Sequence, residues 1–237
     1  MSTLITPLVR KTARADVPLL ENGDHLTRQE FVRRWEAMPN LKRAELIDGV
    51  VYMGAALRHR QHGQPHGLML AWIGGFCFDT PGLEFGDSAS VELDDANEPQ
   101  PDCYLFLPPA LGSGATVNAE GYLEGPLDLI AEVAASSASI DLHKKKQLYE
   151  RHGVREYIVW RTTEDAIDWF VLENGRFISQ VPDSAGIIRS RRCPGLWLDV
   201  AAMIRGDGKR VLEVLDQGLA SAEHAAFVQQ LAPHVKR

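Results

Sequence analysis

The pattern of apolar and polar positions changes its period several times along the chain, and each change marks a predicted helix or strand. Apolar residues recur at helical spacing between residues 59 and 78, which predicts a helix, and Pro65 is a residue typical of its first turn. Short apolar runs at 102–107, 127–133 and 154–160 predict strands. The run at 127–133 is apolar enough to lie at the centre of a sheet.

Two hairpins and one crossover unit organise these segments. Asp48-Gly49 and Asn174-Gly175 each separate two apolar runs, and such turn residues predict hairpins. Between residues 127 and 160 a strand is followed by a helix at about 140–152, by Gly153 at the end of that helix, and by another strand. This strand–helix–strand unit predicts a chain of the mixed α/β type.

The pattern also divides the chain. Residues 1–24 lack a clean period, which predicts an N-terminal arm. Residues 25–205 hold the predicted strands and form the expected single domain, and residues 206–237 are expected to be a helical C-terminal tail.

Composition changes this picture little, but charge bears on function. The chain has 237 residues, of which 45% are hydrophobic, and no apolar run approaches the length of a membrane span. Three widely spaced cysteines, Cys77, Cys103 and Cys193, are typical of a cytoplasmic protein. The net charge of −7 counts against nucleic-acid binding unless a basic patch dominates locally.

Two acids on neighbouring predicted strands are the strongest chemical signal. Asp102 begins one strand, and Glu132 lies in the otherwise apolar strand 127–133. Mg²⁺ binds through one or two carboxylates, with water and phosphate oxygens completing its shell. The alternative is that Glu132 forms a structural ion pair with one of the lysines 144–146, and the pattern alone leaves both interpretations open.

Two further charged groups have a structural and a functional interpretation. The structural interpretation places the three lysines 144–146 on a solvated helix face, with Asp141 and Lys145 as an i,i+4 pair. In the functional interpretation, one of these lysines points inward and stabilises the negative charge that develops on a phosphate. Glu45, just before the first hairpin turn, is either an exposed acid at a strand edge or an additional carboxylate for a metal.

The histidines His59, His62 and His66 lie at helical spacing and raise a zinc alternative. No glutamate accompanies them as in zinc hydrolases, so a surface or substrate-facing role is favoured over zinc binding.

The ordered set of motifs resembles the Uma-type restriction endonuclease family of the PD-(D/E)XK nuclease superfamily. The matching residues are Glu45–Gly49, one of His62 and His66, Pro101-Asp102, Glu132-Val133, Asp141 with Lys145 and Tyr149, Gly153–Tyr157, and Pro194–Leu196. Together they span roughly residues 26–204.

This resemblance implies a central mixed β-sheet flanked by helices, with extra β-hairpins. It implies that Asp102 and Glu132 bind Mg²⁺, with Mn²⁺ as a substitute. The superfamily's usual lysine position, two residues after the second acid, is Ala134 here, and the family is thought to supply the lysine from the following helix, which is Lys145. Glu45 would hold a metal-bound water or a second ion.

The resulting hypothesis is a Mg²⁺-dependent endonuclease that hydrolyses DNA phosphodiester bonds, without a membrane anchor. By analogy with the superfamily, a homodimer is expected. The alternative hypothesis is a catalytically degenerate nuclease fold that binds nucleic acid or protein and in which Glu132 and Lys145 form a structural ion pair.

Overall fold

The computed structural model describes residues 17–54 and 56–234, so residues 1–16 of the predicted N-terminal arm lie outside the described part. The strands are β1 Ala44–Ile47, β2 Val50–Met53, β3 Glu84–Gly86, β4 Val91–Glu92, β5 Cys103–Phe106, β6 Thr116–Val117, β7 Leu123–Glu124, β8 Leu129–Ala134, β9 Glu156–Arg161, β10 Ala166–Glu173, β11 Arg176–Gln180, β12 Ile187–Arg189 and β13 Trp197–Asp199. The helices are α1 Arg28–Glu36, α2 Gln64–Phe78, α3 Lys146–His152, α4 Val200–Arg205, α5 Gly208–Leu219 and α6 Ala222–Leu231. Short helical turns are η1 His59–Gly63, η2 Pro109–Leu111, η3 Ile140–Lys145 and η4 Ala232–His234.

A six-stranded mixed sheet forms the centre of the molecule, in the order β11-β10-β9-β8-β5-β3. The β8–β9 pair is parallel because α3 carries the chain back across the sheet, and the remaining pairs are antiparallel. This arrangement confirms the predicted mixed sheet flanked by helices. Both predicted hairpins are present as β1–β2 and β10–β11.

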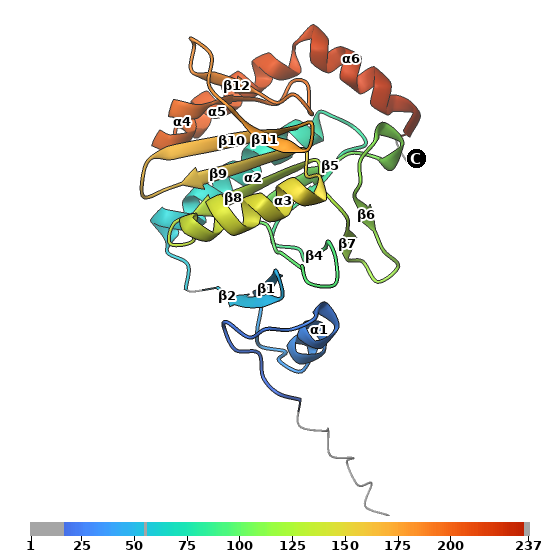
Figure 1. The fold of residues 1–237 in the computed structure, drawn as a ribbon. Helices are drawn as coiled ribbons and strands as arrows, with labels where there is room; N and C mark the ends of the chain where they lie inside the picture. Colours follow the sequence, from blue (N-terminus) through green and yellow to red (C-terminus); the bar gives the residue numbers. More distant parts are fainter. Residues whose placement is uncertain (1–16, 55, 235–237) are drawn as a thin grey trace, which may run out of the picture.

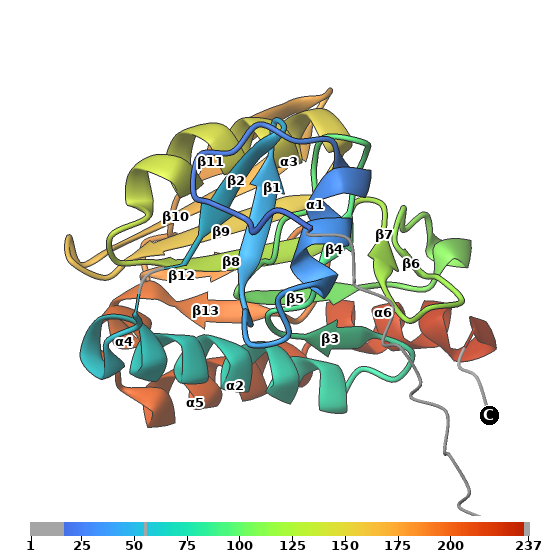
Figure 2. The ribbon, with the colours of Figure 1, turned by 90° about the horizontal axis from the view of Figure 1, so that it is seen from below.

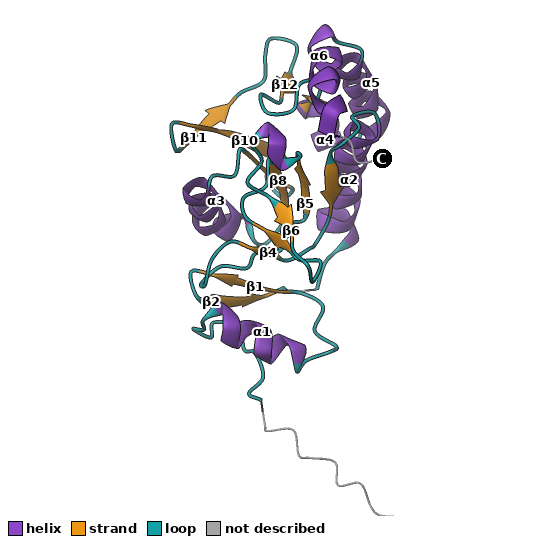
Figure 3. Ribbon diagram, turned by 90° about the vertical axis from the view of Figure 1, so that its right-hand side faces the viewer, coloured by secondary structure: helices purple, strands orange, loops and turns teal. Residues whose placement is uncertain are grey.

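Helices cover both faces of the sheet, as the edge-on view in Figure 3 shows. On one face α3 packs over a core that includes Tyr149, Tyr157 and Phe170. On the other face α2 and the C-terminal helices pack over Trp72, Trp169 and their neighbours. Since successive strand residues point to opposite faces, β8 contributes Ile130 to the first core and Leu129 to the second.

The hairpin β1–β2 lies outside the central sheet, and Figures 1 and 2 show it beside α1. Contacts of Tyr52 with Lys144 and of Asp48 with Arg151 hold it on the α3 side. Backbone hydrogen bonds between Leu46 and Glu98 attach it to the loop that leads into β5. Its own small core includes Leu20 and Phe31, so the described part of the predicted arm is packed at Leu20.

Helices α5 and α6 belong to the same core as the sheet. Helix α5 packs against α2, α4 and β13 and buries Val211, Val214 and Leu215. Helix α6 buries Phe227 and Leu231. Within the described residues, no helix has the length and apolar character needed to span a lipid bilayer.

Two π-helical turns precede regular helices. The turn η1 runs directly into α2, so helical structure begins at His59, six residues before Pro65. The turn η3 likewise runs into α3 at Lys146. Such wide turns are frequent at functional sites, and both lie beside the acids that the sequence singles out.

Candidate active site

The register of β5 and β8 places the two predicted acids side by side. Cys103 pairs with Ala131, so extending the antiparallel register by one residue sets Asp102 opposite Glu132. The Asp102 N–H points at Glu132 Oε2 at 3.4 Å. Both side chains lie on the α3 face of the sheet and are almost fully buried.

Asp102 is held as a carboxylate by groups on three sides. Its Oδ2 accepts a hydrogen bond from the Val133 N–H at 2.8 Å, and its Oδ1 accepts one from Arg43 Nη2 at 2.8 Å. His62 Nε2 lies 3.5 Å from the same Oδ1. Burial opposes ionisation of Asp102, but nearby positive charge, that of Arg43 foremost and then that of Lys145, outweighs it and lowers the pKa of this carboxyl.

Lys145 points inward and joins three acids. Its ammonium lies 2.8 Å from Glu45 Oε1, 2.9 Å from Glu132 Oε1 and 3.7 Å from Asp141 Oδ1. Burial disfavours this charge, yet the carboxylates of Glu132, Glu45 and Asp141 raise the pKa of Lys145 well above its ordinary value. Lys145 therefore stays an ammonium, which can stabilise negative charge but cannot accept a proton.

Glu132 receives the remaining donors of the cluster. The Tyr149 hydroxyl donates to Glu132 Oε1 at 3.1 Å, and burial raises the pKa of that phenol well above its usual range, so it remains a donor. Burial likewise raises the pKa of Glu132, and the Lys145 ammonium opposes this effect. Glu45 is fixed from the other side, because the Gln100 N–H donates to its Oε1 at 2.7 Å.

The cluster carries more negative than positive charge. When the four carboxylates of Glu45, Asp102, Glu132 and Asp141 are all ionised, they face the cations of Arg43 and Lys145, and the formal charge is −2 with His62 counted as neutral. Burial raises the pKa of Glu132 and of Asp141, so this full charge requires a compensating cation. Buried charge without compensation is costly. The excess matches the charge of one divalent cation.

Both candidate histidines contact Asp102. His62 Nδ1 lies 2.9 Å from the Val133 carbonyl and must carry the hydrogen there, while its Nε2 is buried and has no hydrogen-bond partner. His66 Nε2 lies 2.9 Å from the backbone carbonyl of Asp102. His59 is exposed, so the three histidines of the zinc alternative do not converge.

In the described part of the chain, no three side chains of His, Cys, Asp or Glu are close enough to form a metal site by themselves. Mg²⁺ does not require such a set, because it keeps several waters and binds through one or two carboxylates. Asp102 and Glu132 offer that number.

The sequence pattern missed three contributions to this cluster. Arg43 was not considered, although it lies two residues before Glu45 and the strand period places both on one face. Asp141 was treated as part of an exposed helical pair, whereas it is buried. Tyr149 was noted only as part of a motif, and its contact with Glu132 depends on packing that no local pattern encodes.

Comparisons with known proteins identify the fold and the family of the chain. A crystal structure described as a "putative nuclease belonging to DUF820" from Anabaena variabilis matches with a TM-score of 0.59 and 12% identity, covering 76% of this chain and 99% of that one. At that identity the likeness shows the fold. A search of curated proteins finds no match.

The model of the Uma2 family, described as "Putative restriction endonuclease", matches residues 28–201, which is most of the chain and includes every residue of the cluster. The chain therefore belongs to the Uma2 family.

Proposed function

We propose that this chain is a divalent-metal-dependent endonuclease that hydrolyses DNA phosphodiester bonds. Its family and fold indicate a restriction-endonuclease-like nuclease, and the metal and the substrate are the proposed part. The observation that carries the proposal is the buried cluster in which Asp102, Glu132 and Lys145 meet, with a formal excess of two negative charges when all four of its carboxylates are ionised.

The donors fit Mg²⁺, with Mn²⁺ as a substitute. Asp102 and Glu132 supply hard carboxylate oxygens on rigid neighbouring strands, and the formal charge of −2 favours a divalent ion. When bound there, the ion would neutralise phosphate charge and make a water molecule more acidic.

The chain's own residues then have distinct roles. Lys145 would stabilise the negative charge that develops on the phosphate, since its ammonium is held in place by acids before substrate arrives. Tyr149 would orient Glu132 through its hydroxyl. Glu45 would orient Lys145 and, through its remaining oxygen, a water molecule.

Plasmid nicking by purified protein tests this function. We expect nicking that requires Mg²⁺ or Mn²⁺, is lost on chelation, and falls roughly 100-fold or more in Glu132→Gln and in Lys145→Ala. Lys209→Ala removes an exposed lysine on α5 and should cut like the wild type. Cleavage that continues unchanged in both site variants would contradict the proposed site.

A second candidate is a degenerate nuclease fold that only binds. It is favoured by one observation: Arg43 already binds Asp102 Oδ1, and Lys145 already binds Glu132 Oε1, so one oxygen of each acid is taken by a cation of the chain itself. Titration calorimetry separates the two candidates. The endonuclease should release or absorb heat with Mn²⁺ in a site that Asp102→Asn abolishes, and the binding module should show no such heat.

Two further expectations belong to the same proposal. Dimerisation, expected by analogy because cutting both strands of a duplex needs two sites, is tested by sedimentation of the full chain.

A cytoplasmic location is supported by three free and buried thiols, which suit a reducing compartment.

A further inference from the structure

Most arginines of the described chain are paired with an acid, and the exceptions are informative. Fifteen arginines lie in residues 17–54 and 56–234, and eleven of them have a carboxylate within 4.0 Å. The four without such a partner among the described residues are Arg58, Arg60, Arg155 and Arg205, and all four are exposed. In a chain of net charge −7, an arginine that no acid neutralises contributes to a local positive field.

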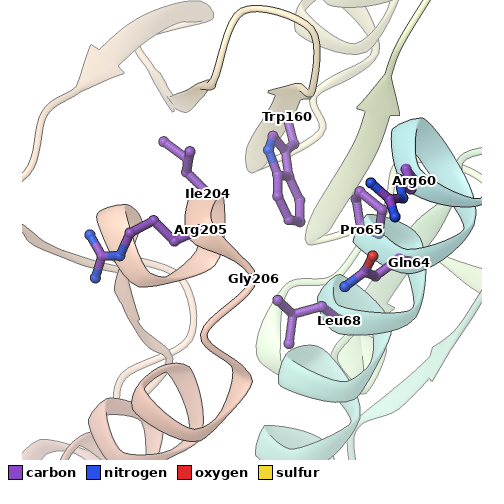
Figure 4. Close-up of a pocket in the computed structure, with 8 residues that line it drawn as sticks. All are labelled: Arg60, Gln64, Pro65, Leu68, Trp160, Ile204, Arg205 and Gly206. Atoms are coloured by element: carbon purple, nitrogen blue, oxygen red, sulfur yellow. The ribbon is translucent and has the colours of Figure 1, made fainter.

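Two of these four line one cavity, and a third is close to it in sequence. Arg60 and Arg205 line a cavity of about 140 Å³ between the start of α2 and the end of α4, and Arg58 lies two residues before Arg60. Figure 4 shows Arg60 and Gln64 on one side, Ile204 and Arg205 on the other, and the indole of Trp160 between them. The Arg205 side chain extends outward from α4 in this view, so its charge lies at the outside of the cavity.

The chemistry of the lining suits a phosphate group. None of the eight described residues that line the cavity is acidic, and the Gln64 amide adds a neutral hydrogen-bond donor. Arginine presents a planar fork of donors that matches phosphate oxygens, and it loses less hydration than lysine when it binds.

The cavity lies near the same end of strands β8 and β9 as the acid cluster, but on the α2 face of the sheet, because Trp160 belongs to the core under α2. Trp160 pairs with Val133 in the parallel β8–β9 register, and Val133 carries the hydrogen bonds to Asp102 and His62. The Arg58 carbonyl accepts hydrogen bonds from the amides of His62 and Gly63, so the arginine segment is fixed to the site histidine. A strand of nucleic acid at the cluster would therefore reach this cavity by passing around the ends of β8 and β9.

We propose that Arg58, Arg60 and Arg205 form a binding site for backbone phosphates of the DNA that flank the cleavage position. This inference rests on the proposed function for the identity of the ligand. It gives the acidic chain a local basic surface for its substrate.

Binding of a fluorescein-labelled DNA duplex, followed by anisotropy with Ca²⁺ in place of Mg²⁺ and at several KCl concentrations, tests the proposal. We expect Arg60→Ala and Arg205→Ala each to weaken binding roughly tenfold at 0.1 M salt and to reduce the slope of log affinity against log salt by about 0.9. Arg58→Ala should act in the same direction.

Arg155→Ala is the matched control. Arg155 is equally unpaired among the described residues and exposed, but it precedes β9, about 16 Å along the strand from Trp160 at roughly 3.3 Å per residue. Its removal should leave the affinity and the salt slope unchanged. An equal loss in Arg155→Ala would mean that only net charge matters, and it would overturn the proposed site, as would unchanged binding in Arg60→Ala and Arg205→Ala.

Different experimental outcomes contradict the proposed function and the proposed arginine site. DNA binding that depends on Arg60 and Arg205 in a protein that never nicks plasmid would support the site and contradict the nuclease. Nicking and Mn²⁺ heats that resemble the wild type in all three arginine variants, with unchanged DNA affinity, would support the nuclease and contradict the site.

Discussion

Arg43 is a partly exposed member of the cluster, and it binds the buried acid Asp102. Its side chain is 26% exposed, whereas that of Asp102 is 3% exposed, so the guanidinium lies between the acid and solvent. It also donates to the Gln100 carbonyl at 3.2 Å. In this position Arg43 supplies the charge that a divalent ion would otherwise bring to Asp102.

We therefore predict that Arg43→Gln strengthens binding of Mn²⁺. Removing a competing positive charge a few ångströms from the ion favours binding by more than 1.4 kcal/mol, or roughly tenfold in affinity, even at an effective dielectric constant of about 20. Titration calorimetry with Mn²⁺ measures the change.

Arg34→Gln is the control for this comparison, because it removes a similarly half-buried, ion-paired arginine from α1. Its Mn²⁺ affinity should equal that of the wild type. Weaker binding in Arg43→Gln would show instead that Arg43 positions Asp102 for the ion.

At the residue scale, the adjacent acids and the contact of Lys145 with Glu132 could be predicted from sequence, and the contacts of Arg43 and Tyr149 could not. Glu132 is conspicuous because a carboxylate interrupts an apolar strand, and Lys145 came from the family resemblance. Arg43 reaches Asp102 across fifty-nine residues of sequence, and such a contact depends on how the hairpin docks. The sequence left His62 and His66 as alternatives, and the structure places both at Asp102, His62 near its carboxylate and His66 at its backbone carbonyl.

At the element scale, one glycine determines how closely α5 approaches β13. A Cβ atom on Gly218 would lie 2.1 Å from the Gly195 carbonyl oxygen and 2.9 Å from the Trp197 ring. Both neighbours are fixed, because one is backbone and the other packs in the core region.

We predict that Gly218→Ala destabilises the protein by about 1–3 kcal/mol, since overpacking forces the helix away from the strand. Gly67→Ala, in α2 with open space around its Cβ position, should leave stability unchanged or raise it by up to about 1 kcal/mol. Urea unfolding followed by tryptophan fluorescence gives both values. Equal stabilities of the two variants would show that α5 can move away from Gly195 and Trp197 without a loss of stability.

Elements with strong local signals were predictable, and those set by packing were not. The hairpins β1–β2 and β10–β11 follow from their turn residues, where Asp48 and Asn174 take positive φ together with the glycines that follow them. The helix Gly208–Leu219 falls within the expected helical tail, but its packing against α2 through Val211 and Leu215 depends on tertiary contacts that the local pattern does not encode. The π-helical turns η1 and η3 have no sequence signature of comparable strength.

At the scale of the whole molecule, the C-terminal helices complete the core. Helices α5 and α6 cover the same apolar cluster that holds Met69, Trp72 and Phe76 of α2. These two helices, which lie within the expected helical tail, thus bury apolar surface of the central domain.

We predict that a chain ending at Gly206 does not unfold cooperatively and aggregates, because the face of α2 would be exposed. Calorimetry of the full chain should show a single transition. Leu215→Ala should lower stability by about 2–5 kcal/mol, while Leu212→Ala, on the same helix but 41% exposed, should change it much less. A shortened chain with an unchanged transition would show that these helices fold independently.

The ion pair between Glu45 and Lys145 has a consequence for the newborn protein. These residues are one hundred positions apart, so at roughly 5–20 residues per second the ribosome makes the glutamate about 5–20 s before the lysine. Until β8, η3 and α3 have emerged and the hairpin β1–β2 has docked, the four acids are not gathered in one place. A chain still under synthesis thus lacks the site altogether, and whatever chemistry the site performs begins only after translation of this chain is well advanced.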